Sequence, residues 1–149
     1  MWGENKYPYL QSVETLGEDV YSAYSSEVKL TRKEAREKIK KYHPNIKVDF
    51  AKKDEIKILE FTEGGRVKTI KFGNIEMSGV EVRTIFGLKS ANFKVNINKD
   101  NIEFKVTGYG HGVGLSQTGA DSLAKQGKSY EQIIKHFYTG VAVVDWNMV

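Results

Sequence analysis

Five glycines between residues 107 and 120 place the strongest constraint on the fold of this chain. The segment reads Thr-Gly-Tyr-Gly-His-Gly-Val-Gly-Leu-Ser-Gln-Thr-Gly-Ala, and glycine stands at every second position from Gly108 to Gly114. Glycine loses more conformational entropy on folding than other residues and gives a core no side chain. The pattern therefore indicates a backbone that turns sharply or meets a ligand closely. Polar residues follow it directly, which is typical of a binding surface.

Composition indicates a soluble globular protein. The chain has 149 residues, of which 40% are hydrophobic and 28% charged, enough for one domain with a core or for two very small ones. The net charge is +4 and the isoelectric point about 9.1. This charge is too small for a dedicated nucleic-acid binder, and it fits either solvated lysine-rich faces or an anionic partner such as a cell-wall polymer. The absence of cysteine excludes disulfides, thiolate catalysis and cysteine metal sites.

The N-terminal residues lack the pattern of a secretory signal peptide, and no run approaches the ~18 apolar residues of a membrane span. The opening is irregular and aromatic, with Trp2, Tyr7 and Tyr9, and it resembles the interior of a longer chain. We therefore expect further sequence upstream. We also expect residues 1–28 to form an irregular arm that packs its aromatics on a single domain over residues 29–149.

Capping signals and apolar periodicity predict four short-to-medium helices and several strands. The helices are expected over residues 31–42, 78–86, 116–127 and 129–138, with capping boxes at the first, second and fourth starts. The strands are expected over residues 46–50, 56–61, 67–72, 92–97, 102–108 and 141–146, with hairpin turns at 63–65 and 98–101. Mostly antiparallel strands with the last two helices near the C-terminus indicate an α+β fold.

The glycine segment also contains the main candidates for a binding site. His111 stands between Gly110 and Gly112 with no bulky neighbour to bury it. Glycines let a ligand reach backbone N–H groups, and a helix that begins near Ser116 would direct its positive end at the same space. Gln117 offers both a donor and an acceptor for sugar hydroxyls or amides. The other histidines show no metal-ligand spacing, so we expect no metal and no cofactor.

A second cluster surrounds Glu81 and Arg83. Glu81 is expected to complete the capping box that Ser78 opens, or to face a cleft. Arg83 lies in an otherwise apolar run, and a partly buried guanidinium needs partners. It is expected either to hold the loop that carries His111 or to bind a ligand directly.

Three segments together resemble the stage II sporulation protein D family of bacterial peptidoglycan lytic transglycosylases. They are Ser78–Phe93 (SGVEVRTIFGLKSANF), Thr107–Ala120 (TGYGHGVGLSQTGA) and Gly127–Gly140 (GKSYEQIIKHFYTG), and their order matches the C-terminal part of the family's domain. The resemblance implies cleavage of glycan strands without water, in which a general acid protonates the glycosidic oxygen and the sugar's 6-hydroxyl closes a 1,6-anhydro ring. It also implies substrate-groove roles for Arg83, Gly110, His111, Gly112, Ser116 and Gln117.

The family's catalytic glutamate has no match in this chain. It lies on an upstream helix in a run of the type E-A-L-K-A-Q-A, which residues 1–149 lack. Glu81, Glu103 and Asp121 remain as acidic candidates, and Glu103 is expected to face solvent, so we assign no catalytic residue here. The resemblance implies peptidoglycan strands and sporulation cell-wall hydrolases as partners, an extracytoplasmic location in the cell wall or septal space, and a membrane anchor only in a longer protein. The alternative is a non-catalytic module that binds cell-wall glycan or protein.

Overall fold

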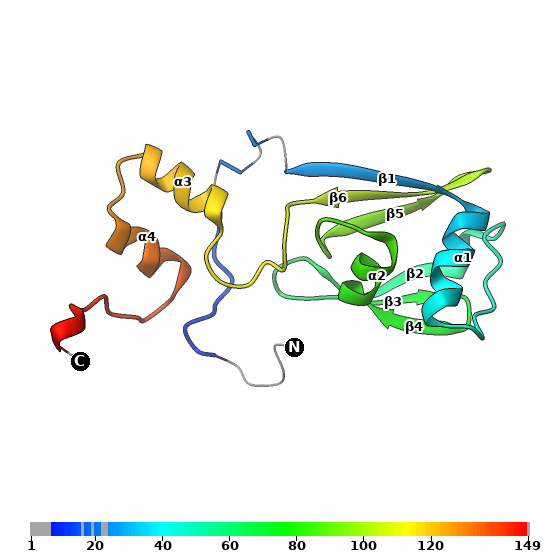
Figure 1. Cartoon of the computed structure of the whole chain (residues 1–149), viewed down its shortest axis with the longest axis horizontal. Helices are drawn as coiled ribbons and strands as arrows, with labels where there is room; N and C mark the ends of the chain where they lie inside the picture. Colours follow the sequence, from blue (N-terminus) through cyan, green and yellow to red (C-terminus); the bar gives the residue numbers. More distant parts are fainter. Residues whose placement is uncertain (1–6, 16, 19, 22–23, 149) are drawn as a thin grey trace. The chain divides into compact units, whose positions relative to one another are not determined.

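The computed structural model describes residues 7–15, 17–18, 20–21 and 24–148, and its contacts divide the chain into two compact units (Figure 1). One unit comprises residues 22–111, and the other combines residues 1–21 with residues 112–149. We call them the sheet unit and the helical unit. The boundary falls inside the glycine segment, after His111.

The sheet unit contains six strands and two α-helices, with a short 3-10 helix before β2. Its elements are β1 (Ser25–Thr31), α1 (Arg32–Tyr42), η1 (Lys53–Glu55), β2 (Ile56–Phe61), β3 (Val67–Phe72), β4 (Ile75–Ser78), α2 (Gly79–Phe86), β5 (Phe93–Ile97) and β6 (Asn101–Thr107). The strands form two antiparallel sheets, in the orders β1-β6-β5 and β2-β3-β4. The predicted hairpin turns at 63–65 and 98–101 join β2 to β3 and β5 to β6.

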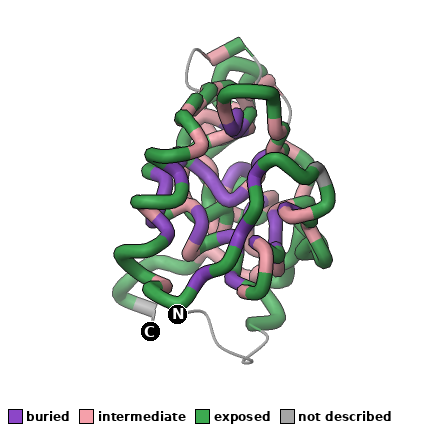
Figure 2. The backbone as a smooth tube through the Cα atoms, turned by 90° about the vertical axis from the view of Figure 1, so that its right-hand side faces the viewer, coloured by how far each residue is buried: buried purple, intermediate pink, exposed green. Residues whose placement is uncertain are grey.

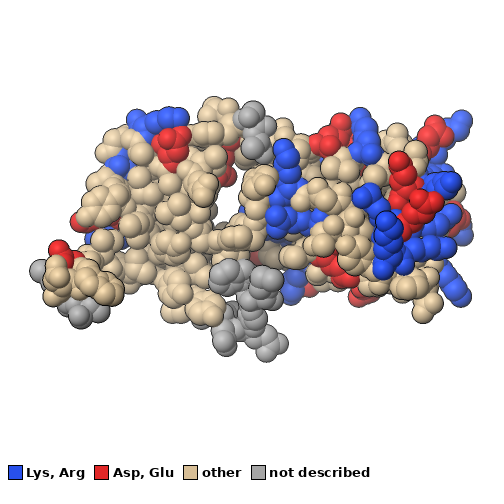
Figure 3. Space-filling view, viewed as in Figure 1, with Lys and Arg blue, Asp and Glu red and all other residues tan. Residues whose placement is uncertain are grey.

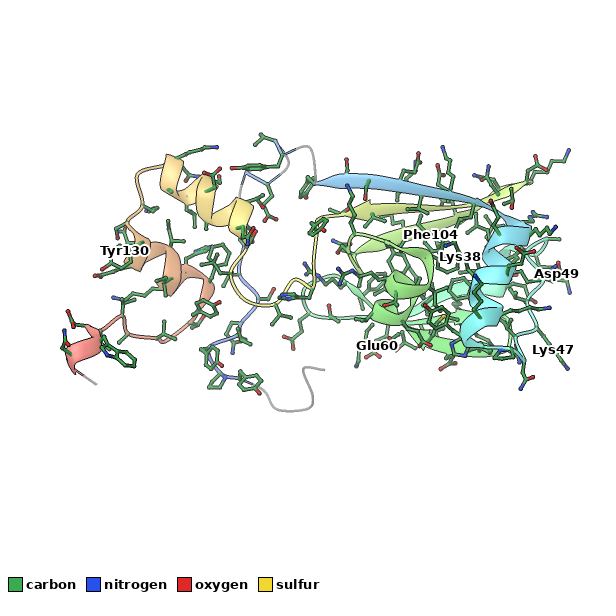
Figure 4. The ribbon with its side chains drawn as sticks, in the orientation of Figure 1. Lys38, Lys47, Asp49, Glu60, Phe104 and Tyr130 are labelled. Atoms are coloured by element: carbon green, nitrogen blue, oxygen red, sulfur yellow. The ribbon has the colours of Figure 1, made fainter. Side chains whose placement is uncertain are left out.

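The core of the sheet unit is aromatic at its centre. The ring of Phe86 on α2 lies 6.1 Å from that of Phe72 on β3 and 4.7 Å from that of Phe104 on β6, so one helix residue connects the two sheets. All three side chains are buried, and Phe104 is labelled in Figure 4. Buried positions recur along both sheets and on the inner faces of the helices (Figure 2). This packing fixes α2 and therefore the loop that follows it.

The helical unit consists of α3 (Gln117–Lys125), α4 (Tyr130–Phe137), a short 3-10 helix η2 (Trp146–Met148) and the N-terminal segment that contacts them. Thr139 N donates to Tyr9 O at 3.0 Å, and the rings of Tyr9 and Tyr138 lie 6.3 Å apart. The imidazole of His136 on α4 lies 2.8 Å from Glu14 O. Part of the predicted N-terminal arm thus packs on α4, while Trp2 lies outside the described residues.

The two units carry opposite charge. The sheet unit contains 19 lysines and arginines against 12 aspartates and glutamates, whereas the rest of the chain contains 4 against 7. Blue side chains accordingly gather over α1 and the sheets in Figure 3, with red ones among them. The net charge of +4 for the whole chain is therefore the sum of +7 on the sheet unit and −3 on the rest of the chain.

The predicted α+β class is confirmed, with four helices and the last two near the C-terminus. The capping boxes at Thr31 and Ser129 are both present. Ser78 caps α2 as predicted, but its box is not closed, because the Glu81 carboxylate contacts His43 instead. Gly87 ends α2 at a φ of 70°, as expected of a left-handed C-terminal residue.

The strand predicted over residues 46–50 is wrong. Ile46, Val48 and Phe50 are buried in alternation, but no neighbouring strand pairs with this segment. Its backbone instead bonds to a turn, since Lys47 N donates to Asn74 Oδ1 at 2.6 Å. The alternating pattern correctly indicated which side chains are buried. The segment does not form a strand because it pairs with no other strand in the described part of the chain.

Two other boundaries differ from prediction. Residues 141–146 do not form a strand, although they are rich in β-branched residues. Val144 and Trp146 are 57% and 87% exposed, and the segment pairs with no strand that the structure describes. In contrast, β1 begins at Ser25, inside the segment expected to be an irregular arm, because it pairs with β6 along its whole length. β4 was not predicted. The division into an N-terminal arm over residues 1–28 and a single domain over residues 29–149 stays a prediction.

Candidate functional site

The alternating glycines adopt a backbone conformation that other residues avoid. The φ angles of Gly108, Gly110, Gly112 and Gly114 are 73°, 83°, 69° and 84°, whereas no non-glycine residue in the described part of the chain has a positive φ. A side chain in this left-handed region costs roughly 1–2 kcal/mol. The sharp turning expected from the sequence is therefore confirmed, and glycine is required at each position by conformation.

Open space surrounds the first two of these glycines. A Cβ atom at Gly108 or Gly110 would have no heavy atom within 4 Å among the described residues, its chain neighbours aside. At Gly114 it would lie 3.2 Å from the Tyr138 hydroxyl, and at Gly119 it would collide with Thr15. Crowding thus adds to the constraint at Gly114 and Gly119, whereas the backbone at Gly108 and Gly110 is open to an approaching molecule.

The loop that follows α2 holds this part of the glycine segment. Gly110 N donates to Lys89 O at 2.9 Å, and Ser90 and Gly110 form an isolated parallel bridge. Arg83 on α2 donates from Nε to Leu88 O at 3.3 Å. Arg83 therefore restrains the loop after α2, whose Lys89 O accepts from Gly110 N. Both roles expected for Arg83, holding the loop that carries His111 and binding a ligand, stay predictions.

Tyr109 and His111 flank Gly110, and both are exposed. The Tyr109 side chain is 71% exposed, among the largest exposures of any aromatic residue in the described part of the chain. His111 was predicted as a site residue from the sequence, and Tyr109 was not. The exposure of Tyr109 could be predicted from its position between two glycines, because glycine has no side chain for the ring to pack against.

The N-terminus of α3 is occupied by a carboxylate of the same chain. Ser116 Oγ accepts a hydrogen bond from Gly119 N at 3.2 Å, as an N-cap, and donates one to Glu18 Oε1. Thr118 Oγ1 donates to the same oxygen at 2.9 Å. The positive end of α3, expected to face a ligand, therefore faces Glu18 in this structure. No local sequence signal identified Glu18, because it lies 98 residues before Ser116.

Gln117 is the first residue of α3, and its side chain is exposed. It makes no hydrogen bond to any residue that the structure describes. Its amide therefore keeps a free donor and a free acceptor. Of the polar residues at this helix start, Gln117 is the one with unused capacity for a ligand.

The predicted site residues are divided between the two units. Arg83, Gly110 and His111 belong to the sheet unit, whereas Gly112, Ser116 and Gln117 belong to the helical unit. The structure brings Arg83 and Gly110 to one loop, and it places Ser116 and Gln117 at one helix start. The common groove expected from all six stays a prediction.

Each acidic candidate is engaged in a local contact. Glu81 Oε1 lies 2.6 Å from the His43 imidazole. Glu103 alternates with the core residues Ile102 and Phe104 on β6, but it is only 8% exposed, so the expected exposure to solvent is wrong. Its carboxylate pairs with Lys29 Nζ at 3.1 Å. Hydrogen bonding with Glu27, and then with Lys29, lowers the pKa of Glu103 from 4.5 to about 2.

Asp121 on α3 is held in the same way. Its carboxylate lies 2.7 Å from Lys125 Nζ and accepts a hydrogen bond from Tyr21, and these two contacts lower its pKa. A general acid that works near neutral pH needs a raised carboxyl pKa. Glu103 and Asp121 are shifted in the opposite direction, and neither is suited to protonate a leaving group.

The described ranges contain no cluster of three or more histidines, aspartates or glutamates arranged to hold a metal ion. Nor do they contain a helix with the length and apolar character needed to cross a membrane.

Comparison with known proteins identifies relatives over most of the chain. The chain is 33% identical over 136 residues to stage II sporulation protein D of Bacillus subtilis, which covers 91% of this chain and 38% of that protein. It is 36% identical over 106 residues to stage II sporulation protein D of Bacillus amyloliquefaciens, covering 70% and 31%. A third relative, the amidase enhancer of Bacillus subtilis, is 33% identical over 103 residues, covering 64% and 14%. No family model matches the chain.

Two of these three bacterial relatives are named as stage II sporulation protein D. The chain belongs to the stage II sporulation protein D family. It spans less than two fifths of the length of the two sporulation proteins that it matches.

Proposed function

We propose that this chain holds the glycan strand in a sporulation protein that cleaves peptidoglycan as a lytic transglycosylase. The single observation that carries the proposal is the open, left-handed backbone at Gly108 and Gly110 beside the exposed His111. The N–H groups of Gly108 and Gly110 donate to Tyr24 O and Lys89 O, so the sugar is proposed to lie on the uncovered backbone surface at these glycines and beside the exposed His111 side chain. Gln117 adds an amide with free donor and acceptor.

In the proposed reaction one carboxyl group acts first as acid and then as base. It protonates the glycosidic oxygen and then takes the proton from the sugar's 6-hydroxyl as the 1,6-anhydro ring closes. The carboxylates of Glu103 and Asp121 have lowered pKa values and existing cationic partners. We therefore assign the acid to a residue outside positions 1–149, and the groove residues to binding and orientation.

The setting of the reaction is part of the same proposal. Two of the relatives are named for sporulation, and the third is named as an enhancer of an amidase. We propose a role at the cell wall or septum outside the cytoplasm, during engulfment, together with other cell-wall hydrolases. A membrane anchor is proposed for the longer protein.

Retention on purified sacculi tests the binding role. The 149-residue chain is expected to sediment with sacculi, and His111→Ala and Gln117→Ala are each expected to reduce the retained fraction several-fold. Gln126→Ala is the matched control, since Gln126 is an exposed glutamine at the other end of α3 whose amide bonds to Ser122. Unchanged retention of both test variants contradicts the site assignment.

The alternative is a binding module without catalysis. It is favoured by the contacts of Glu81, Glu103 and Asp121, which leave none of these carboxylates poised as an acid. Release of anhydro-muropeptides separates the two functions. The transglycosylase proposal expects no release by residues 1–149 alone and release once upstream sequence with a glutamate-bearing helix is present. Release by residues 1–149 alone contradicts the placement of the acid, and no release by either protein favours the binding module.

A further inference from the structure

Lysines stand directly opposite one another on the outer faces of both sheets in the sheet unit. Lys57 on β2 is opposite Lys71 on β3, and Lys94 on β5 is opposite Lys105 on β6. All four side chains are exposed, and they alternate along their strands with residues of the core. Like charges at directly opposite positions destabilise a sheet, so both pairs lower the stability of the fold.

Each lysine pair belongs to a row of three charged residues that ends in a carboxylate. Glu76 on β4 stands opposite Lys71, and Glu27 on β1 stands opposite Lys105. In each sheet the carboxylate therefore lies on one edge strand and a lysine on the other, which is β2 or β5. Glu27 pairs with Lys29, and none of the four lysines in the two rows forms an ion pair within the described ranges.

A hollow lies between the two edge strands that carry the free lysines. Ile56 on β2 and residues 95–98, at the end of β5 and just after it, line this hollow of about 330 Å³. Lys57 and Lys94 are the chain neighbours of two of the lining residues. The exposed amide of Asn96 lines the hollow as well. Positive charge therefore borders the hollow on both strands, and the carboxylates of the rows lie on the far strands.

This arrangement favours a flexible chain of phosphate groups as the partner. Neighbouring strands lie about 4.8 Å apart, so one phosphate cannot reach lysines on four strands, whereas a chain of repeated phosphates can. The cations are all ammonium groups, which bind phosphate as point charges, whereas a planar carboxylate is better matched by a guanidinium fork. The one carboxylate on β2 and β5, Glu60, already pairs with Lys68 at 2.7 Å.

The same strands offer little to nucleic acid. None of the exposed aromatic residues in the described part of the chain lies on β3, β5 or β6. Nucleobases that followed the lysines across these strands would therefore find no ring to stack on. Small polyol units between the phosphates need no such ring, and their hydroxyl groups can bond to the amide of Asn96.

We propose that Lys57, Lys71, Lys94 and Lys105, with the hollow between β2 and β5, form a docking surface for a linear polyol-phosphate polymer. The phosphates pair with the four lysines, and the hydroxyl groups bond to Asn96. The surface uses no residue of the glycine segment, so it is independent of the glycan-binding role. It gives a reason for opposed lysines in both sheets, which folding alone disfavours.

Binding of fluorescently labelled poly(glycerol phosphate) to the 149-residue chain, followed by anisotropy, tests this surface. The wild-type chain is expected to bind with an affinity that falls as the salt concentration rises. Lys57→Gln and Lys94→Gln are each expected to weaken binding about threefold, and the double variant about tenfold. The double variant Lys33→Gln/Lys40→Gln is the matched control, because it removes the same charge from two exposed lysines of α1, and it is expected to bind nearly as the wild type does.

Thermal unfolding of the same variants separates binding from folding. Removal of one lysine from an opposed pair relieves repulsion, so Lys57→Gln and Lys94→Gln are expected to keep or raise Tm while they lose affinity. A fall in Tm that accompanies the loss of affinity means that these lysines support the fold, which contradicts their assignment to the polymer.

Three other anions test the class of partner. Poly-L-glutamate, a single-stranded oligonucleotide and phosphatidylglycerol vesicles are each expected to bind several-fold more weakly than poly(glycerol phosphate). Equal or tighter binding of one of them identifies an acidic protein, a nucleic acid or a membrane as the partner and overturns the polyol phosphate. No binding of poly(glycerol phosphate) by the wild-type chain, or an equal loss of affinity in the α1 control, overturns the docking surface itself.

Discussion

Gly110→Ala separates what the glycine segment contributes to stability from what it contributes to binding. Gly110 has a φ of 83°, and a Cβ atom there would meet no heavy atom within 4 Å. The substitution therefore carries the conformational cost of a left-handed alanine, roughly 1–2 kcal/mol, without a steric cost. For a chain of this size that corresponds to a fall in Tm of about 2–8 °C.

Gly65→Ala is the matched control for this experiment. Gly65 lies in the β2–β3 turn of the same unit, has a φ of 71°, and also has no heavy atom within 4 Å of a Cβ position. The two variants are expected to lose similar stability, measured by thermal unfolding. Only Gly110→Ala is expected to lose glycan binding, at least tenfold, because its methyl group projects into the space assigned to the ligand.

Three results refute this reasoning. Wild-type affinity in Gly110→Ala means that the ligand does not use the open space. Equal loss of affinity in Gly65→Ala means that binding reports on general stability. A far larger loss of stability in Gly110→Ala than in Gly65→Ala means that the space around Gly110 is not open in solution.

Three further substitutions test the structural account. Glu18→Gln is expected to destabilise the helical unit by ~1–2 kcal/mol, and a double-mutant cycle with Ser116→Ala should show coupling; additive effects contradict the contact. Because folding lowers the pKa of Glu103 from 4.5 to about 2, its ionised form stabilises the fold above pH 4.5, and this stability is lost as the pH falls toward 2. Glu103→Gln should therefore reduce the dependence of Tm on pH between 4.5 and 2. An unchanged dependence contradicts the lowered pKa. Gly79→Ala should lower Tm despite alanine's higher helix propensity, because its Cβ collides with Val67 O; a raised Tm contradicts that crowding.

The helices could be predicted because their signals are local. A capping box uses a side chain and a backbone N–H only three residues apart, so Thr31 with Glu34 and Ser129 with Gln132 are readable from the sequence. The same locality explains a partial error at Ser78. Glu81 has the right spacing, but its carboxylate contacts His43, 38 residues away, and spacing alone carries no information about that competitor.

The strands were less predictable because a strand depends on its partner. Residues 46–50 alternate between buried and exposed like a strand and yet bond to the turn at Asn74. Residues 141–146 have β-branched composition and remain without a partner strand. In contrast, β1 has no strong pattern of its own and forms because β6 pairs with it from Ser25 to Thr31.

The candidate site was predicted where glycine itself carries the information. Alternating glycines from Gly108 to Gly114 indicated unusual backbone conformations, and each has a positive φ. Glu18 could not be predicted at the start of α3, because a tertiary contact over 98 residues leaves no local trace. The exposed ring of Tyr109 could be predicted from its two glycine neighbours, which have no side chains to cover it.

Residue-resolved amide shifts during glycan titration test the central claim most directly. The measurement follows the backbone N–H signals of the 149-residue chain as a soluble peptidoglycan glycan is added. We expect saturable shifts concentrated at Gly108, Tyr109, Gly110, His111 and Gln117, the open backbone and the exposed residues assigned to the glycan. Saturable shifts confined to other parts of the chain, or no shifts at all, contradict the assignment of the glycine segment as the glycan-binding surface.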